Sequence, residues 1–181
     1  MVYRFKLVSD EVSNFSREIE VDSENTFLQL RNTILESVNY TKDELDSFFL
    51  CSDEWERQEE ITLEDMGTTA CDNDIWLMEN TPIGELVEDE GQKLSFVFDY
   101  MTERSFFMEL KEIIPNRSLV EPVCTIKRGK APAQTVDMEE FDKKIDEKAK
   151  AAIEDFENEP FDENAFDDED LSDGFDIMNI N

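Results

Sequence analysis

The sequence predicts an α+β fold, and three observations support this prediction. Two adjacent segments near the N-terminus, 3–7 and 15–21, alternate apolar and polar residues as strands do. A capped amphipathic helix follows them at 26–38. A second pair of alternating segments lies at 93–113. Because no strand–helix–strand unit repeats, this order predicts a β-grasp-like mixed or antiparallel sheet with one main helix packed across it.

The first two segments are expected to form a hairpin. Tyr3, Phe5 and Leu7 alternate with basic residues, which is typical of a half-buried strand. The segment 15–21 keeps the same period of two, and polar residues suited to a turn separate the two segments.

The main helix has a clear start and one apolar face. Thr26 followed three residues later by Gln29 forms a capping box. Apolar residues then recur at helical spacing, so one face of the helix is expected to pack on the sheet. These residues are Phe27, Leu30, Ile34 and Val38.

The middle of the chain carries weaker signals. A strand is predicted at 48–51. The polar segment 52–80 has no clear period, although 75–78 suits a short strand or a loop. Thr81 and Pro82 predict a short second helix, with Thr81 as the N-cap and Pro82 at the first helical position.

The segment 93–113 is expected to be an antiparallel hairpin with one buried face. Leu94, Phe96 and Phe98 share one parity of its first strand, and Phe106 and Met108 share one parity of its second. Such alternation is typical of an antiparallel pair that packs on a core.

A change in composition near residue 131 predicts the domain boundary. The α+β domain is expected at 1–130, a linker at 131–136, an amphipathic acidic helix at 137–159 and an acidic tail at 160–181. Of the 47 acidic and 17 basic residues, 18 and 4 lie in 131–181. Three outcomes are open for the helix: docking on its own domain, binding a second copy or another protein, or remaining unformed.

The net charge of −30 and the absence of histidine exclude several functions. Histidine is the commonest general base and zinc ligand, so we expect no metal site and no cofactor. The acidity opposes binding to a nucleic-acid phosphate backbone. Cys51, Cys71 and Cys124 form no closely spaced pair, which favours thiols in a reducing compartment. Without a signal-peptide segment or a long apolar run, we expect a cytoplasmic protein outside the membrane.

The turn of the second hairpin holds Asp99, Glu103 and Arg104, and it has two interpretations. A catalytic site would use the two acids as paired carboxylates and Arg104 as an electrostatic clamp. The structural interpretation makes these residues the polar tip of a hairpin. We favour the structural interpretation and expect no enzymatic activity, because nothing in the sequence brings the two acids together.

Trp55 and Trp76 stand in the polar segment and also have two interpretations. Together they would line an aromatic ligand-binding site, whereas separately they would pack in the core. Core packing is the commoner role of tryptophan in a small domain, and we favour it.

Beyond Pro160 acidic runs alternate with apolar residues. The simpler interpretation is a disordered solubilising tail. The alternative is a linear motif whose aromatic side chains enter a groove on a partner while carboxylates steer it toward basic rims. The candidate partner-binding residues are Phe161, Phe166, Leu171 and Phe175.

Five short motifs resemble those of a known family. They are Phe15-Ser16-Arg17, Leu45-Asp46-Ser47-Phe48, Phe98-Asp99-Tyr100, Pro122-Val123-Cys124 and Gly129-Lys130-Ala131-Pro132. The chain thereby resembles the Ri-plasmid ORF-three-like family, which shows a hairpin of the type Y-D-F-G-D-x-W-x-H followed by a Pro-x-Cys segment. Members also carry the label of TnpR-like passenger proteins of an insertion element. The similarity covers residues 1–134.

This resemblance implies an α+β fold near the β-grasp type and no assigned activity. Met101, Arg104 and Phe106 stand where the family has glycine, tryptophan and histidine. Any metal or acid–base role of those positions is therefore expected to be lost here. The chain shows no serine-recombinase nucleophile context and no basic DNA-binding helix, so the TnpR label implies no recombinase activity.

Three functions follow from these patterns. The leading hypothesis is a non-enzymatic protein-interaction module whose partner offers a basic or hydrophobic groove. The second is a mobile-element accessory that imitates nucleic acid through its charge. The third is a small enzyme that uses Asp99, Glu103 and Arg104.

Overall fold

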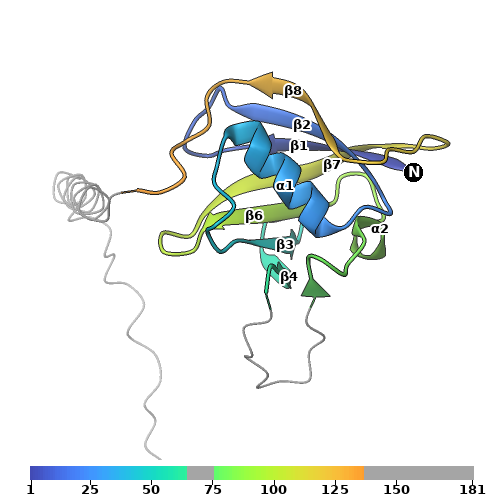
Figure 1. Ribbon diagram of the computed structural model, residues 1–181, viewed down its shortest axis with the longest axis horizontal. Helices are drawn as coiled ribbons and strands as arrows, with labels where there is room; N and C mark the ends of the chain where they lie inside the picture. The colour runs from blue at the N-terminus through green and yellow to red at the C-terminus, as the bar shows by residue number, and fades with distance from the viewer. Residues whose placement is uncertain (65–75, 137–181) are drawn as a thin grey trace, which may run out of the picture. The chain divides into compact units, whose positions relative to one another are not determined.

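The computed structural model describes residues 1–64 and 76–136, and a compact unit extends from Met1 to Thr135 (Figure 1). This unit has a mixed sheet of eight described strands and one main helix, which confirms the predicted α+β class. In chain order the elements are β1 (Val2–Val8), β2 (Ser16–Asp22), α1 (Phe27–Val38), β3 (Ser47–Cys51), β4 (Arg57–Thr62), β5 (Trp76–Leu77), α2 (Ile83–Leu86), β6 (Lys93–Asp99), β7 (Arg104–Ile114) and β8 (Val123–Arg128).

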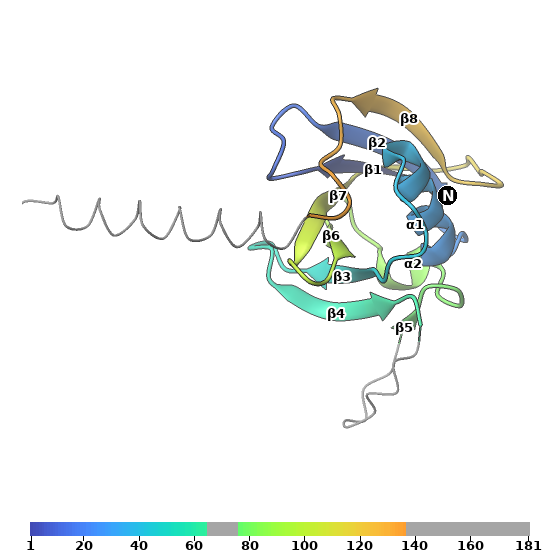
Figure 2. The same cartoon turned by 60° about the vertical axis from the view of Figure 1, so that its left-hand side comes forward.

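The strands lie in the order β5-β4-β3-β6-β7-β1-β2-β8. All neighbours pair antiparallel except β4 and β5, which pair parallel. The predicted hairpin β6–β7 therefore lies near the middle of the sheet, between β3 and β1. Figure 2 shows the sheet curling from β8 around to β4, with α1 on its concave side.

Helix α1 forms as the sequence predicts. The backbone N–H of Gln29 donates to Thr26 Oγ1 at 3.4 Å, and the N–H of Thr26 donates to Gln29 Oε1 at 2.9 Å. Asn39 ends the helix in the left-handed conformation with φ 58°. Such local bonds satisfy backbone groups that a helix end leaves unpaired.

The core lies between α1 and the concave face of the sheet. Its aromatic part comes mainly from the central strands, where Phe98 and Phe106 pack with ring centroids 4.6 Å apart. Phe48 and Phe96 pack at 4.7 Å beside them. The fully buried side chains of α1 that meet this layer are Phe27, Leu30, Ile34 and Leu35.

The structure adds two strands that the sequence did not predict, β4 and β8. Strand β4 begins with four exposed residues, and β8 alternates only between exposed and half-buried positions, with the apolar Val123 at an exposed one, so the period-two signal is weak. Strand β8 leads into Gly129, which has φ +64° and lies so close to Asn14 that an added Cβ would sit 2.4 Å from its carbonyl oxygen. Glycine is therefore required where β8 leaves the sheet.

The predicted cap of the second helix was wrong. The helix is α2, and Pro82 rather than Thr81 is its N-cap, without a side-chain capping bond. Thr81 Oγ1 instead donates to the carbonyl of Leu77 at 2.8 Å. The hydroxyl therefore stabilises the turn after β5 instead of the helix start. No helix among residues 1–64 and 76–136 is long and apolar enough to cross a membrane.

The first residues of the expected linker lie along the domain. Tyr40 Oη donates to the Pro132 carbonyl at 2.7 Å, and the Thr41 N–H donates to Gln134 Oε1 at 2.8 Å. The compact unit consequently ends at Thr135 instead of residue 130. The helix and tail expected from residue 137 onward lie outside the described residues.

A buried ion pair joins α1 to the start of β3. Arg31 Nε donates to both carboxylate oxygens of Asp46, at 2.6 and 2.8 Å, and the two side chains are 4% and 3% exposed. Arg31 also donates to the carbonyls of Lys42 and Glu44. These bonds hold the loop after α1 against the helix.

We expect Asp46→Ala to lower the free energy of unfolding by about 3–5 kcal/mol, because it leaves the Arg31 guanidinium buried without its counterion. The matched change Glu36→Ala removes the exposed Lys42–Glu36 pair, whose N–O distance is 2.8 Å, and should cost less than about 0.5 kcal/mol. Urea unfolding of both variants measures the difference. Equal losses would contradict the structural role of the buried pair.

Strand β2 also carries a buried carboxylate with two partners. Burial alone would raise the pKa of Glu20, but hydrogen bonds from Arg4 at 2.9 Å and Arg117 at 2.8 Å outweigh it and hold that pKa below its usual value. The unfolded chain therefore takes up the proton first as the pH falls.

This carboxylate should make stability depend on pH in the acid range. The stabilisation is fully present above the unfolded pKa of about 4.3 and is lost as the pH falls through the lower folded value. Glu20→Gln should therefore flatten the fall of the unfolding free energy below about pH 4.3 relative to the exposed control Glu121→Gln. Urea unfolding between pH 3 and 6 tests this, and parallel curves for the two variants would refute it.

Candidate functional site

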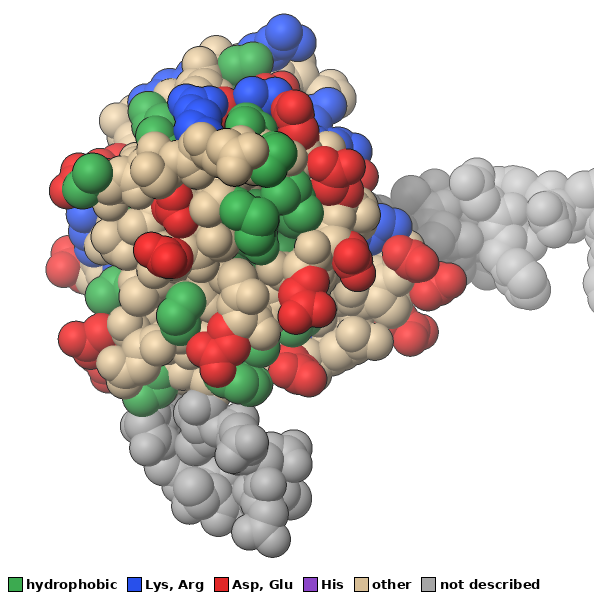
Figure 3. Space-filling model, turned by 90° about the vertical axis from the view of Figure 1, so that its right-hand side faces the viewer, with side chains coloured by type: hydrophobic (Ala, Val, Ile, Leu, Met, Phe, Trp, Pro, Cys, Tyr) green, Lys and Arg blue, Asp and Glu red, His purple; other side chains and the backbone are tan. Residues whose placement is uncertain are grey.

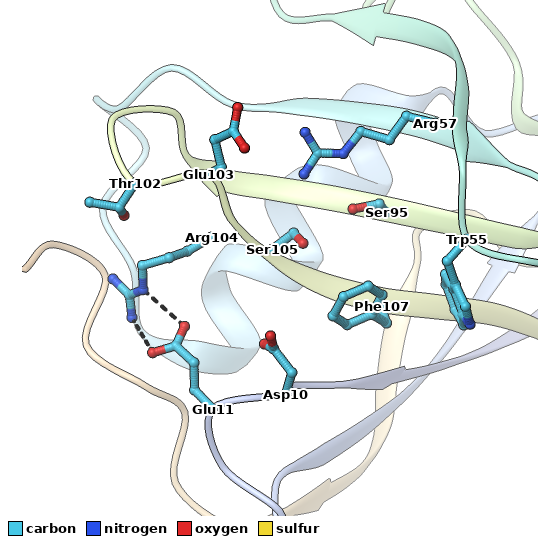
Figure 4. A pocket seen from close by; sticks show the side chains of 10 residues that line it. All are labelled: Asp10, Glu11, Trp55, Arg57, Ser95, Thr102, Glu103, Arg104, Ser105 and Phe107. Carbon is cyan, nitrogen blue, oxygen red and sulfur yellow. Dashed lines mark hydrogen bonds and ion pairs between the residues drawn. The ribbon is translucent and has the colours of Figure 1, made fainter. Parts of the chain in front are cut away.

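A pocket of about 280 Å³ opens on the face of the sheet opposite α1, beside the β6–β7 turn (Figure 4). Three separate parts of the chain line it. The loop after β1 contributes Asp10 and Glu11, and the β3–β4 region contributes Trp55 and Arg57. The hairpin contributes the remaining residues, which are Ser95, Thr102, Glu103, Arg104, Ser105 and Phe107.

The same register that builds the core builds this pocket. Phe96 pairs with Phe106 and both side chains face α1. Ser95 pairs with Phe107, and these residues of opposite parity face the other side of the sheet. Ser105 on β7 lies on that same side, so the pocket floor is made of strand residues rather than mobile loop residues.

One wall of the pocket is aromatic. The rings of Trp55 and Phe107 meet edge to face, with centroids 5.0 Å apart and an interplanar angle of 86°. The backbone of Trp55 has φ 67°, and its backbone N–H donates to the Ser52 carbonyl at 3.0 Å. A tight turn of the backbone therefore holds the tryptophan in place. Lys93 Nζ lies 5.1 Å from the indole centroid and donates to the carbonyl of Asp53.

The floor of the pocket carries two hydroxyl groups. Ser95 and Ser105 are only 3% and 6% exposed. Ser95 Oγ is buried and has no hydrogen-bond partner within residues 1–64 and 76–136. Figure 4 shows both hydroxyls between Arg57 above and Asp10 below. A buried hydroxyl without a partner is unfavourable for the folded protein, so this group needs an explanation.

Arg104 is the most heavily bonded side chain at the turn. Its Nε and Nη2 atoms donate to the two carboxylate oxygens of Glu11, both at 2.9 Å. Its guanidinium also donates to the carbonyls of Ala133 at 2.7 Å and Gln134 at 3.2 Å. The side chain is 8% exposed, so Arg104 joins the hairpin to the β1–β2 loop and to the end of the compact unit.

Asp99 organises the backbone of the turn. One of its carboxylate oxygens accepts from the N–H of Met101 at 3.0 Å, and the other accepts from Thr102 Oγ1 at 2.6 Å. Aspartate commonly stabilises turns in this way. The Arg104 guanidinium lies 3.6 Å from the same carboxylate.

Three ionic groups of the pocket are not used by the fold. Asp10, Glu103 and Arg57 make no ion pair with any other described residue. The Arg57 guanidinium lies 5.0 Å from the centre of the Phe49 ring. Glu103 has φ 54° at the tip of the turn and points away from Glu11 in Figure 4.

A tyrosine follows Asp99 on the same turn and lies outside the pocket. Tyr100 Oη contacts Ser47 Oγ and donates to Glu60 Oε1 at 2.5 Å. Burial, and then the neighbouring Glu60, raise the pKa of Tyr100 to about 12. The phenol is therefore neutral at physiological pH and serves as a hydrogen-bond donor.

The residues that the sequence proposed for catalysis share one turn, and Asp99 and Arg104 lie 3.6 Å apart. Asp99 is also bonded within the turn, while Arg104 is bonded to Glu11. Of the tryptophans, Trp55 lines the pocket, whereas Trp76 packs against the core, so they do not form one aromatic site.

Several residues of the pocket were missed by the sequence analysis, chiefly Asp10, Arg57, Ser95, Ser105 and Phe107. The available signal was a serine inside the apolar run of β6 and another directly before the apolar run of β7. The partner-binding candidates Phe161, Phe166, Leu171 and Phe175 lie outside the described residues.

Two thiols of the described chain are free, and both are partly or fully buried. Burial raises the pKa of Cys51 and of Cys124, which lowers their reactivity as nucleophiles. Cys71 lies outside the described residues. Within residues 1–64 and 76–136, no group of three or more Asp, Glu, Cys or His side chains is arranged to hold a metal ion.

Comparisons with known proteins agree with the resemblance seen in the sequence. The family model described as "Plasmid pRiA4b ORF-3-like protein" matches residues 2–170. The crystal structure of a protein of unknown function from Methanosarcina mazei Go1 is similar, with a TM-score of 0.55 and 20% sequence identity. The similarity covers 70% of this chain and 68% of that chain, and it shows the fold alone. No curated protein matches the chain.

We expect Arg104→Ala to lower the free energy of unfolding by about 2–4 kcal/mol, because it removes a nearly buried partner of Glu11 and frees two backbone carbonyls. Arg104→Lys should recover only part of this loss, since an ammonium cannot make the same forked contact. Urea unfolding measures both variants. Hydrogen exchange at the Thr41 amide, which donates to Gln134, should accelerate in both variants. Full recovery by lysine would contradict the proposed role of the fork.

Proposed function

This chain belongs to the plasmid pRiA4b ORF-3-like family, and we propose that it is a non-enzymatic, cytoplasmic protein-interaction module with a basic protein partner. The observation that carries the proposal is how the hairpin tip uses its ionic groups. Arg104 and Asp99, the groups best suited to chemistry there, are both bonded to other parts of the fold.

Acid–base catalysis needs a group that is free to exchange a proton with a bound substrate. Both oxygens of the Asp99 carboxylate accept hydrogen bonds from the turn, and Arg104 is held by a bidentate contact with Glu11. Glu103 and Asp10 remain, and neither has a base or a nucleophile bonded to it among the described residues. This arrangement favours recognition over catalysis.

The charge of the chain favours a basic partner. With 47 acidic and 17 basic residues, the field of the chain attracts positively charged surfaces over long range. Figure 3 shows acidic side chains spread over one face of the domain, with Lys and Arg gathered toward its upper edge. Long-range attraction of this kind raises association rates and selects partners by sign of charge.

The proposed partner-binding element is the acidic segment that follows Pro160. Its residues Phe161, Phe166, Leu171 and Phe175 alternate with carboxylates. Apolar side chains act as anchors when they enter a hydrophobic groove on a partner, whereas charges exposed at the rim contribute little to affinity. We therefore assign affinity to the apolar residues and steering to the carboxylates.

Imitation of nucleic acid is the second candidate, and the net charge of −30 favours it. A nucleic-acid mimic would bind through its charge alone, so its binding should collapse with salt. It should also tolerate loss of the aromatic side chains. These two properties separate the candidates.

We expect the triple substitution Phe166→Ser, Leu171→Ser and Phe175→Ser in the full chain to abolish capture of the partner at moderate salt. The domain should stay folded, with an unchanged urea unfolding curve. The matched control replaces three polar residues of the same tail, Asn164, Asn179 and Asn181, by serine. Capture from host lysate, followed by binding of the purified partner, measures the effect. If the triple-serine variant binds the partner as well as the unaltered chain does, and this binding is lost at high salt, the nucleic-acid mimic becomes the better explanation.

A further inference from the structure

We propose that the pocket beside the β6–β7 turn binds a protonated alkylamine, that is, an ammonium group on an aliphatic stem. A lysine side chain of another protein and a small free amine share this chemistry. The inference is independent of the proposed tail interaction, because it uses only residues of the compact unit. The family description names no ligand, and the proposed ligand class for this pocket is a primary ammonium.

The charges that line the pocket select a cation. Glu11 is neutralised by the bidentate contact with Arg104. The groups left over are the carboxylates of Asp10 and Glu103 and the guanidinium of Arg57, so the unpaired charge is −1. The net charge of −30 on the whole chain adds to this and repels anions.

Ser95 supplies a second, independent observation. Ser95 is one of the residues that line the pocket, and its hydroxyl oxygen is buried and has no hydrogen-bond partner among the described residues. An ammonium group has three donors and no acceptor, so it can donate to the lone pairs of a hydroxyl and of a carboxylate at the same time. Ser105 offers another hydroxyl on the same floor, and Asp10 lies below both in Figure 4.

The aromatic wall suits the rest of the ligand. Phe107 and Trp55 offer apolar surface to an aliphatic stem, and the electron-rich face of an aromatic ring attracts a nearby cation. The chain already shows this affinity, because its own Lys93 places Nζ 5.1 Å from the centre of the Trp55 ring.

The size of the pocket limits the ligand to one side chain or a small molecule. Its volume of about 280 Å³ is below the range of pockets that hold cofactors or drug-sized ligands. Two positive side chains disfavour a cation, Lys93 beside the Trp55 ring and Arg57. Arg57 is exposed and lies over the Phe49 ring, at the side of the pocket away from Asp10 in Figure 4.

Titration of the ¹⁵N-labelled full chain, followed by NMR, tests the inference. The probes are n-butylammonium, the uncharged isostere butan-1-ol, and a short peptide blocked at both ends whose only charge is one lysine side chain. We expect saturable shifts of the Ser95, Ser105 and Phe107 amides with the two ammonium probes and none with the alcohol. Asp10→Asn should weaken binding about threefold to tenfold, whereas the exposed control Asp43→Asn should leave it unchanged.

The two probes distinguish the sources of the amine. Tighter binding of the peptide supports a lysine side chain of another protein, whereas tighter binding of free butylammonium supports a small amine. The triple tail variant of the preceding section should titrate like the unaltered chain, so failure of the tail proposal leaves this result intact. The inference is overturned if no ammonium probe gives saturable shifts, if butan-1-ol binds equally well, or if the two Asp→Asn variants behave alike.

Discussion

The register of the β6–β7 hairpin is the constraint on which both the core and the pocket depend. Because side chains alternate along a strand, placing Phe96 and Phe106 against α1 sends Ser95 and Phe107 to the opposite face. A slip of one residue would exchange the two sets and would bury hydroxyls in the aromatic core. The core thus fixes the floor of the pocket, and the pocket inherits the rigidity of the central sheet.

Several arginine side chains stabilise this domain by binding carboxylates and backbone carbonyls of distant segments. Arg31 holds the loop after α1 through Asp46, and Arg104 holds the β1–β2 loop through Glu11. Burial lowers the pKa of Arg17. Its guanidinium donates to four backbone carbonyls, those of Ser16, Ser37, Arg128 and Gly129. Such contacts occupy these charged groups, whereas the carboxylates of Asp10 and Glu103 in the pocket form no ion pair among the described residues. This division explains how a strongly acidic chain combines a stable fold with a charged site.

Local signals predicted the first hairpin, the capped helix α1 and the second hairpin, because each is defined by a period or cap within a few residues. They missed β4, which begins with four exposed residues, and β8, which has no fully buried position to mark one face. They also placed the domain end before Gln134, whose side chain forms hydrogen bonds with the backbone of Thr41. The same limit applies to the site. Sequence drew attention to Trp55 and to the turn, but only the sheet order brings Arg57 and Asp10 beside Ser95, since these contacts join distant segments.

In the amine site proposed above, the buried Ser95 hydroxyl and the unpaired carboxylates of the pocket receive an ammonium group. A crystal structure of the full chain grown with n-butylammonium would show this contact. We expect the ammonium nitrogen about 3 Å from Ser95 Oγ, on the side facing Asp10, with the alkyl stem along Phe107. A Ser95 hydroxyl bonded to a group of the protein itself, or a pocket filled by one of the chain's own side chains, would contradict it.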